Sequence, residues 1–127
     1  MDSFRKQILG TPGGGNALNC FLCGSCTAGC PVNALDDNYN PRLIMRMLLL
    51  ERKEEVLASK ELWKCSQCHI CVAHCPQDVR FADVVRALRE LALAGDYASA
   101  ALAAEVAAID AETKKTRLEK ISNLLET

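Results

Sequence analysis

The sequence predicts an all-α protein built around a duplicated cysteine motif. No segment of its 127 residues alternates apolar and polar residues with the period of two that a half-buried strand requires. Apolar residues instead recur at helical spacing in several segments. A run of four cysteines followed by proline occurs twice, with 34 residues (31–64) between the runs. We therefore expect two pseudo-repeated units, each a cysteine loop plus a helix, and a C-terminal helical extension.

The first 19 residues are predicted to be a flexible arm. Gly10, Pro12, Gly13, Gly14 and Gly15 fall within ten positions of one another, and such segments usually behave as linkers. An arm that docks on a partner is the alternative interpretation. The predicted organisation is an arm over residues 1–19, a central domain over 20–94 and a helical extension over 95–127.

The two cysteine runs contain every cysteine of the chain. Each member of the first run recurs 45 residues later in the second: Cys20, Cys23, Cys26 and Cys30 before Pro31, then Cys65, Cys68, Cys71 and Cys75 before Pro76. The pattern leaves no cysteine over for a disulfide or a catalytic thiol.

The spacing C-x2-C-x2-C-x3-C-P is typical of proteins that hold two 4Fe-4S clusters, and the fourth cysteine of each run then binds the other cluster. Proline after that cysteine biases it toward extended backbone and directs it away from its own loop. The predicted ligands are Cys20, Cys23, Cys26 and Cys75 for cluster 1, and Cys65, Cys68, Cys71 and Cys30 for cluster 2.

Two other uses of the cysteines fit the pattern less well. Zinc sites usually show pairs of C-x2-C separated by a longer spacer, so three ligands within seven residues is an unusual layout for zinc. A disulfide framework is disfavoured because the N-terminal residues do not resemble a secretory signal. Thiols in this context point to a reducing cytoplasm, and we expect an anaerobic or low-oxygen one.

Between the runs, one long helix is predicted from about Pro41 to Ala58. Asn40 is a suitable N-cap and Pro41 a suitable first helical residue. Leu43, Ile44, Met47 and Leu48 then share one helical face.

After the second run, a further helix is predicted from the spacing of Val84, Val85, Leu88, Leu91 and Ala92. Gly95 is the expected stop of this helix and Asp96 the expected N-cap of an Ala-rich helix through Ala108. A last amphipathic stretch carries Leu118, Ile121, Leu124 and Leu125. The small two-cluster ferredoxins contain strands, so the helical content here favours a helical ferredoxin domain instead.

The remaining composition excludes several function classes. The formal net charge is −1, from 15 Lys and Arg against 16 Asp and Glu, and no basic stripe suggests nucleic acid. The longest apolar stretch, residues 43–50, is too short to span a bilayer. No nucleotide-binding glycine motif follows a strand, and His69 and His74 more readily hydrogen-bond near a cluster than ligate it. No catalytic residues are predicted, and single-electron transfer is the expected chemistry.

Residues 16–93 resemble the C subunit of heterodisulfide reductase and its bacterial homologues. The resemblance rests on the first run from Asn19 to Pro31, on Asn40-Pro41-Arg42, and on the second run from Trp63 to Pro76. It implies a helical domain with two 4Fe-4S clusters bound by the eight cysteines.

The resemblance also implies a role. Members of this family relay electrons between the A subunit, which holds flavin and iron-sulfur clusters, and the B subunit, which is cysteine-rich and reduces disulfides; they do not catalyse the reaction themselves. The expected partners are therefore proteins like these A and B subunits, in a hetero-oligomer. A free, diffusing helical ferredoxin is the alternative. The near-neutral charge disfavours it, because diffusing carriers often rely on charge asymmetry.

Overall fold

The computed structural model describes residues 3–126 and contains helices but no strand in that range, which confirms the all-α prediction. The parts of the expected arm and extension formed by residues 1–2 and 127 lie outside the described residues. The elements are, in order, α1 (Phe4–Leu9), η1 (Ala17–Asn19), α2 (Ser25–Ala28), α3 (Pro31–Leu35), α4 (Pro41–Leu49), α5 (Lys53–Leu57), η2 (Lys60–Trp63), α6 (Ile70–His74), α7 (Phe81–Ala94) and α8 (Ala100–Leu125).

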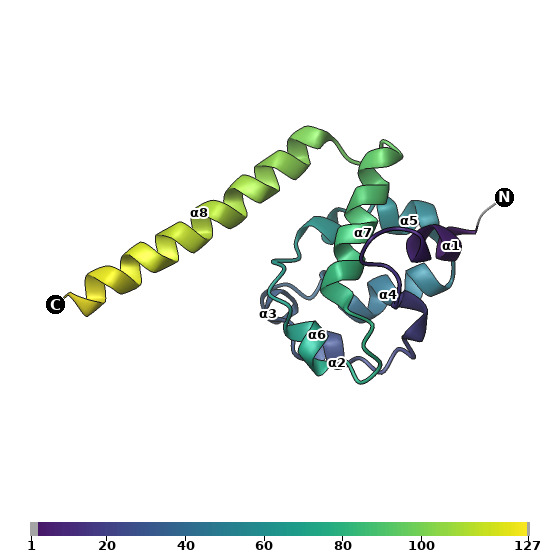
Figure 1. The fold of residues 1–127 in the computed structure, drawn as a ribbon, viewed down its shortest axis with the longest axis horizontal. Coiled ribbons are helices and arrows are strands. Elements are labelled where there is room, and N and C mark those ends of the chain that lie inside the picture. The colour runs from purple at the N-terminus through teal and green to yellow at the C-terminus, as the bar shows by residue number, and fades with distance from the viewer. Residues whose placement is uncertain (1–2, 127) are drawn as a thin grey trace. The chain divides into compact units, whose positions relative to one another are not determined.

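The chain divides into two compact units, residues 1–97 and 98–127. In the first unit, α7 is the central element and packs against α1, α5, α6 and η2 (Figure 1). Its buried face is the one that the helical spacing predicts, with Val84, Val85 and Leu88 fully enclosed. The other large, fully buried side chains of the core are Ile8, Tyr39, Met45, Leu48, Val56, Leu57, Leu62 and Phe81.

The segment expected to be a flexible arm contains helix α1. Ser3 caps this helix by accepting a hydrogen bond from the Lys6 backbone N–H. Phe4 and Ile8, one helical turn apart, are both buried, and α1 packs against α4 and α7. The glycines that follow this short amphipathic helix make it difficult to recognise in the sequence. Burial of its two large apolar side chains holds it against the rest of the unit.

The single helix expected from Pro41 to Ala58 is wrong, because the structure contains two helices there. Helix α4 ends at Leu49 and α5 begins at Lys53, with Glu51 between them in the left-handed region at φ 58°. The turn allows Val56 and Leu57 to be buried while α5 packs against both α4 and α7. A straight helix would carry α5 away from α7.

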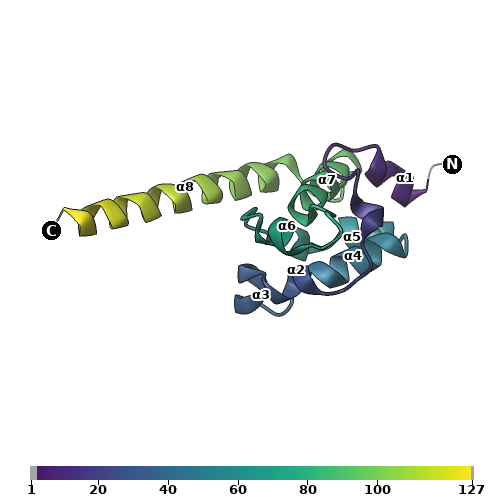
Figure 2. The same cartoon turned by 60° about the horizontal axis from the view of Figure 1, so that its bottom comes forward.

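The two cysteine loops end in short helices that pair with each other. Helices α2 and α6 occupy equivalent places in the repeat, since Ile70 lies 45 residues after Ser25. They lie side by side in both views (Figures 1 and 2). A side chain at Gly29 would contact the His74 ring at 3.3 Å, so the glycine allows this close approach. The pairing brings the two cysteine runs together.

The C-terminal unit is a single helix. Gly95 caps the end of α7 as predicted, but Asp96 is not the cap of the next helix. Ser99 is, because its hydroxyl accepts from the Leu102 backbone N–H at 3.1 Å, and α8 then continues unbroken to Leu125. Nothing in the sequence between Ala108 and Leu118 interrupts a helix, so the two expected segments are one. No helix within residues 3–126 is long and apolar enough to cross a membrane.

Candidate functional site

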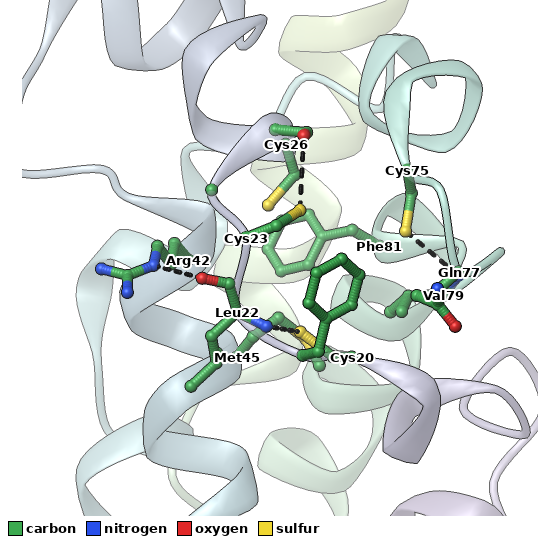
Figure 3. A pocket seen from close by; sticks show the side chains of 13 residues that line it. Cys20, Leu22, Cys23, Cys26, Arg42, Met45, Cys75, Gln77, Val79 and Phe81 are labelled. Carbon is green, nitrogen blue, oxygen red and sulfur yellow. Dashed lines mark hydrogen bonds between the residues drawn. The ribbon is translucent and has the colours of Figure 1, made fainter.

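A cavity in the first unit is bordered by four of the eight cysteines. Cys20, Cys23 and Cys26 come from the first loop (residues 20–30), and Cys75 comes from the end of the second loop (residues 65–75). Figure 3 shows the four side chains around one space, with Phe81 of α7 on the same wall. None of the eight cysteines forms a disulfide. These four are the set that the sequence predicts for cluster 1.

The first loop has the backbone geometry that a wrapping loop needs. Leu22 and Gly24 both have positive φ, 61° and 85°, which turns the chain twice within three residues. The first turn brings the Leu22 N–H to 3.3 Å from Cys20 Sγ as a hydrogen-bond donor. The loop therefore presents backbone donors as well as thiols toward the cavity.

The Asn-Pro-Arg segment at the start of α4 holds the first loop in place. The Thr27 hydroxyl donates to Asn40 Oδ1 at 3.0 Å and accepts from the Arg42 backbone N–H at 2.9 Å. Asn40 Oδ1 also accepts from the Leu43 N–H at 3.1 Å, which confirms Asn40 as the N-cap. The Arg42 side chain reaches back to the loop, where its Nε donates to the Leu22 carbonyl at 2.7 Å.

The fourth cysteine of each run has the extended backbone expected for a residue before proline. Cys30 and Cys75 have nearly identical extended backbone, with φ −77° and −75° and ψ 121° and 120°. Cys75 Sγ accepts from the Val79 N–H at 3.4 Å. Cys75 lies close enough to Cys20 for its charge to raise the pKa of the Cys20 thiol, although burial raises that pKa more.

The second loop repeats the geometry of the first. Gln67 and His69, which correspond to Leu22 and Gly24, have φ of 56° and 64°. The Gln67 N–H lies 3.4 Å from Cys65 Sγ, as the Leu22 N–H does from Cys20 Sγ. The same loop conformation is thus built twice, once with glycine and once with histidine at the left-handed position.

Arg89 of α7 supports the second loop from the core side. Its guanidinium donates to the Leu62 and Cys65 carbonyls at 3.1 and 2.9 Å and lies 5.1 Å from the centre of the Trp63 ring. This arrangement places Trp63 against the entry to the second loop. Its role is therefore packing beside the cysteines, with a cation–π contact that adds to the burial of the ring.

A buried tyrosine, Tyr39, lies near Cys30 and near two cysteines of the second run. Tyr39 is fully buried, and its pKa is raised far above its ordinary value by burial and by the neighbouring Cys65, Cys30 and Cys71. Three of the four cysteines predicted for cluster 2 therefore lie near one side chain, although they come from different loops.

Buried and exposed thiols of the loops differ in how easily they ionise. Burial raises the pKa of the Cys26 thiol and raises that of Cys71 to about 11. At exposed Cys23 the pKa is lowered, because the Ser25 hydroxyl lies 3.3 Å from its sulfur and stabilises the thiolate. Buried thiols of this kind ionise readily when a bound metal takes the place of the proton.

The cavity chemistry fits an iron-sulfur cluster. Its wall combines four thiols with apolar side chains such as Met45, Val79 and Phe81 and with backbone N–H donors to sulfur. Within residues 3–126, no group of three or more His, Cys, Asp or Glu side chains is arranged to hold a single metal ion. The residues that sequence reasoning missed are Tyr39, Val79 and Arg89, which lie outside the cysteine motif and carry no local signal.

Comparison with known proteins agrees with this chemistry. Residues 19–80 match the family described as the 4Fe-4S dicluster domain. The chain is 44% identical over 78 residues to the iron-sulfur C subunit of the CoB–CoM heterodisulfide reductase of Methanopyrus kandleri, and the match covers 61% of this chain and 40% of that protein.

Two further relatives have related names. The C subunit of the H(2):CoB-CoM heterodisulfide,ferredoxin reductase of Methanothermobacter thermautotrophicus is 39% identical over 101 residues, 79% of this chain and 54% of that protein. The C subunit of the ferredoxin:CoB-CoM heterodisulfide reductase of Methanosarcina acetivorans is 35% identical over 88 residues, 69% and 35% respectively. In each case the match spans less than two thirds of the relative.

The match and the geometry concern the same part of the chain, namely the two cysteine loops and the helices that hold them. Residues 19–80 of this chain therefore match the family described as the 4Fe-4S dicluster domain, and they resemble the corresponding part of heterodisulfide reductase C subunits.

Proposed function

We propose that this chain is an electron-relay subunit of a heterodisulfide-reductase-like complex. Its two 4Fe-4S clusters supply single-electron transfer, because four thiolate ligands leave no iron site open for substrate. The observation that carries the proposal is the cavity where the two cysteine loops meet. It is bordered by Cys20, Cys23, Cys26 and Cys75. The protein's own contribution is to position and insulate that site.

We propose crossed ligation of the clusters. Cluster 1 is bound by Cys20, Cys23, Cys26 and Cys75, and cluster 2 by Cys65, Cys68, Cys71 and Cys30. The extended backbone of Cys30 and Cys75 supports this assignment, as does the proximity of Cys30 to Tyr39, which also lies near Cys65 and Cys71. Crossed ligation makes the pairing of α2 and α6 a condition for both clusters, because neither loop completes a site alone.

The arrangement favours a relay rather than a catalyst. Cys26 and Cys71 are close enough for their charges to interact, so the two sites adjoin through α2 and α6. Cys23 and Cys68 are exposed, one in each loop, so each site has a side that reaches the surface. An electron can therefore enter beside one loop and leave beside the other.

The partners that we propose are an A-type subunit with flavin and iron-sulfur clusters and a B-type subunit that is cysteine-rich and reduces disulfides, in the cytoplasm. The support is the similarity to proteins whose names describe C subunits of heterodisulfide reductases. Helix α8 exposes Ile109, Leu118, Leu124 and Leu125, which gives the chain apolar surface suited to a permanent assembly.

Ligation is tested with single Cys→Ser variants purified anaerobically. Under crossed ligation, Cys75→Ser alters the same electron paramagnetic resonance signal as Cys20→Ser, and Cys30→Ser alters the same one as Cys68→Ser. If Cys75→Ser instead shares its effect with Cys68→Ser, each run binds its own cluster. Zinc without sulfide in the wild-type protein would refute the cluster assignment entirely.

The relay role is tested by anaerobic purification of the tagged chain from its host, with identification of co-purifying proteins. Recovery in fixed ratio with a flavoprotein and a cysteine-rich protein is the expected result. Recovery of the chain alone, with iron and sulfide intact, would refute the complex and support a free ferredoxin.

A further inference from the structure

Equivalent cysteines of the two loops receive different hydrogen bonds. Cys20 and Cys65 open their loops 45 residues apart, and each sulfur accepts from the backbone N–H two residues later, at 3.3 and 3.4 Å. Cys65 Sγ also lies 3.5 Å from Gln67 Nε2. The residue that corresponds to Gln67 in the first loop is Leu22, whose side chain has no donor. The repeat is therefore symmetric in its backbone but not in its donors.

The orientation of the Gln67 amide is set by its surroundings. Nε2 donates to the Ala82 carbonyl at 3.2 Å as well as facing Cys65 Sγ, so both amide hydrogens have an acceptor. The opposite orientation would place Oε1 against a carbonyl oxygen and a thiolate, two acceptors that repel it. Ala82 lies in α7, so the core of the unit holds this amide in place.

Tyr39 places a second side-chain hydroxyl near the same cysteine. The residue lies in the segment between α3 and α4, where its carbonyl accepts from Asn33 Nδ2 at 2.8 Å and its N–H donates to the Asp36 carbonyl at 3.1 Å. Its side chain is fully buried and lies near Cys65. A phenol hydroxyl can donate a hydrogen bond to a sulfur.

We propose that Gln67 and Tyr39 set the reduction potential of cluster 2 by donating hydrogen bonds to the Cys65 thiolate. The inference rests on the proposed function, because it requires Cys65 to be a cluster ligand. A cluster bound here would gain one negative charge on reduction, part of it on the ligating sulfurs. Donors to those sulfurs stabilise the reduced state more than the oxidised state and raise the potential.

The test uses the repeat as its own control. Gln67→Leu gives the second loop the residue of the first, Leu22→Gln does the reverse, and Tyr39→Phe removes one hydroxyl from the core. Each holoprotein is purified anaerobically, its iron and sulfide are measured, and both midpoint potentials are determined by redox titration with electron paramagnetic resonance.

We expect Gln67→Leu and Tyr39→Phe to lower the same one of the two potentials, and the double variant to lower it further. Leu22→Gln should raise the other potential. Full iron and sulfide content with both potentials unchanged in the two single variants would overturn the inference, as would shifts in different clusters. If Gln67→Leu loses iron, Gln67→Met removes the donor while keeping the length of the side chain. Failure of the wild-type protein to hold two clusters would instead refute the proposed function.

Discussion

Replacing Thr27 by valine tests how the start of α4 stabilises the first loop. The substitution keeps a β-branched side chain of similar size and removes only the hydroxyl. The corresponding residue of the second loop is Val72, so the loop conformation accommodates valine. What is lost is the donation to Asn40 Oδ1 at 3.0 Å and the acceptance from the Arg42 N–H at 2.9 Å.

The cost follows from these two hydrogen bonds. Each contributes about 1 kcal/mol to the free energy of unfolding, and the partly exposed Arg42 N–H recovers some of its share from water. The expected loss is therefore about 1–2 kcal/mol. For a unit of 97 residues this corresponds to a fall of about 5–10 °C in the midpoint of thermal unfolding.

The assay is anaerobic differential scanning calorimetry of the cluster-loaded protein at one scan rate. Thr116→Val, on the exposed surface of α8, is the control and should leave the midpoint nearly unchanged. Asn40→Ala removes the shared acceptor, so the double variant should lose less than the sum of the single losses. Equal midpoints for Thr27→Val and the control, or strictly additive losses with Asn40→Ala, would refute the proposed network.

Three further predictions use other parts of the chain. Gly14→Ala should prevent stable folding of the first unit, because the added Cβ would overlap the Ile8 carbonyl. Gly15→Ala is the control: its Cβ meets no atom within 4 Å, so circular dichroism and thermal unfolding should be unchanged. Similar thermal unfolding of both variants would contradict this prediction. His69→Gly should raise the midpoint of thermal unfolding, because glycine adopts φ 64° without the strain of a side chain. Gly24→Ala, at φ 85°, should lower it. The opposite order would show that loop strain does not limit stability. Removal of the clusters by a chelator should abolish most of the helical signal of the first unit, and a protein that keeps its full signal without iron would show that it folds independently of metal.

Much of the fold could be predicted from the sequence because its strongest signals are local. Proline after asparagine marked the start of α4, and the spacing of Val84, Val85 and Leu88 marked the buried face of α7. The break at Glu51 could not be predicted, since no glycine or proline announces it. It exists because α5 must reach α7, and that requirement depends on tertiary packing.

The candidate site shows the same division. The spacing of the cysteines groups Cys75 with Cys20, Cys23 and Cys26, and these four border one cavity. That they bind one cluster stays a prediction. The side chains that surround the sulfurs could not be found in the same way. Tyr39 and Arg89 lie 26 and 24 residues before and after Cys65, and only the folded chain brings them to it.

The residues between the cysteines make the two loops of a symmetric motif chemically different. In this chain the repeat keeps the cysteines, the positive φ angles and the paired helices, and changes what fills the loops. Leucine in the first loop is replaced by glutamine in the second, where the amide faces Cys65 Sγ. If the clusters are bound as we propose, the duplicated scaffold holds both, and the substituted positions provide the means to separate their potentials.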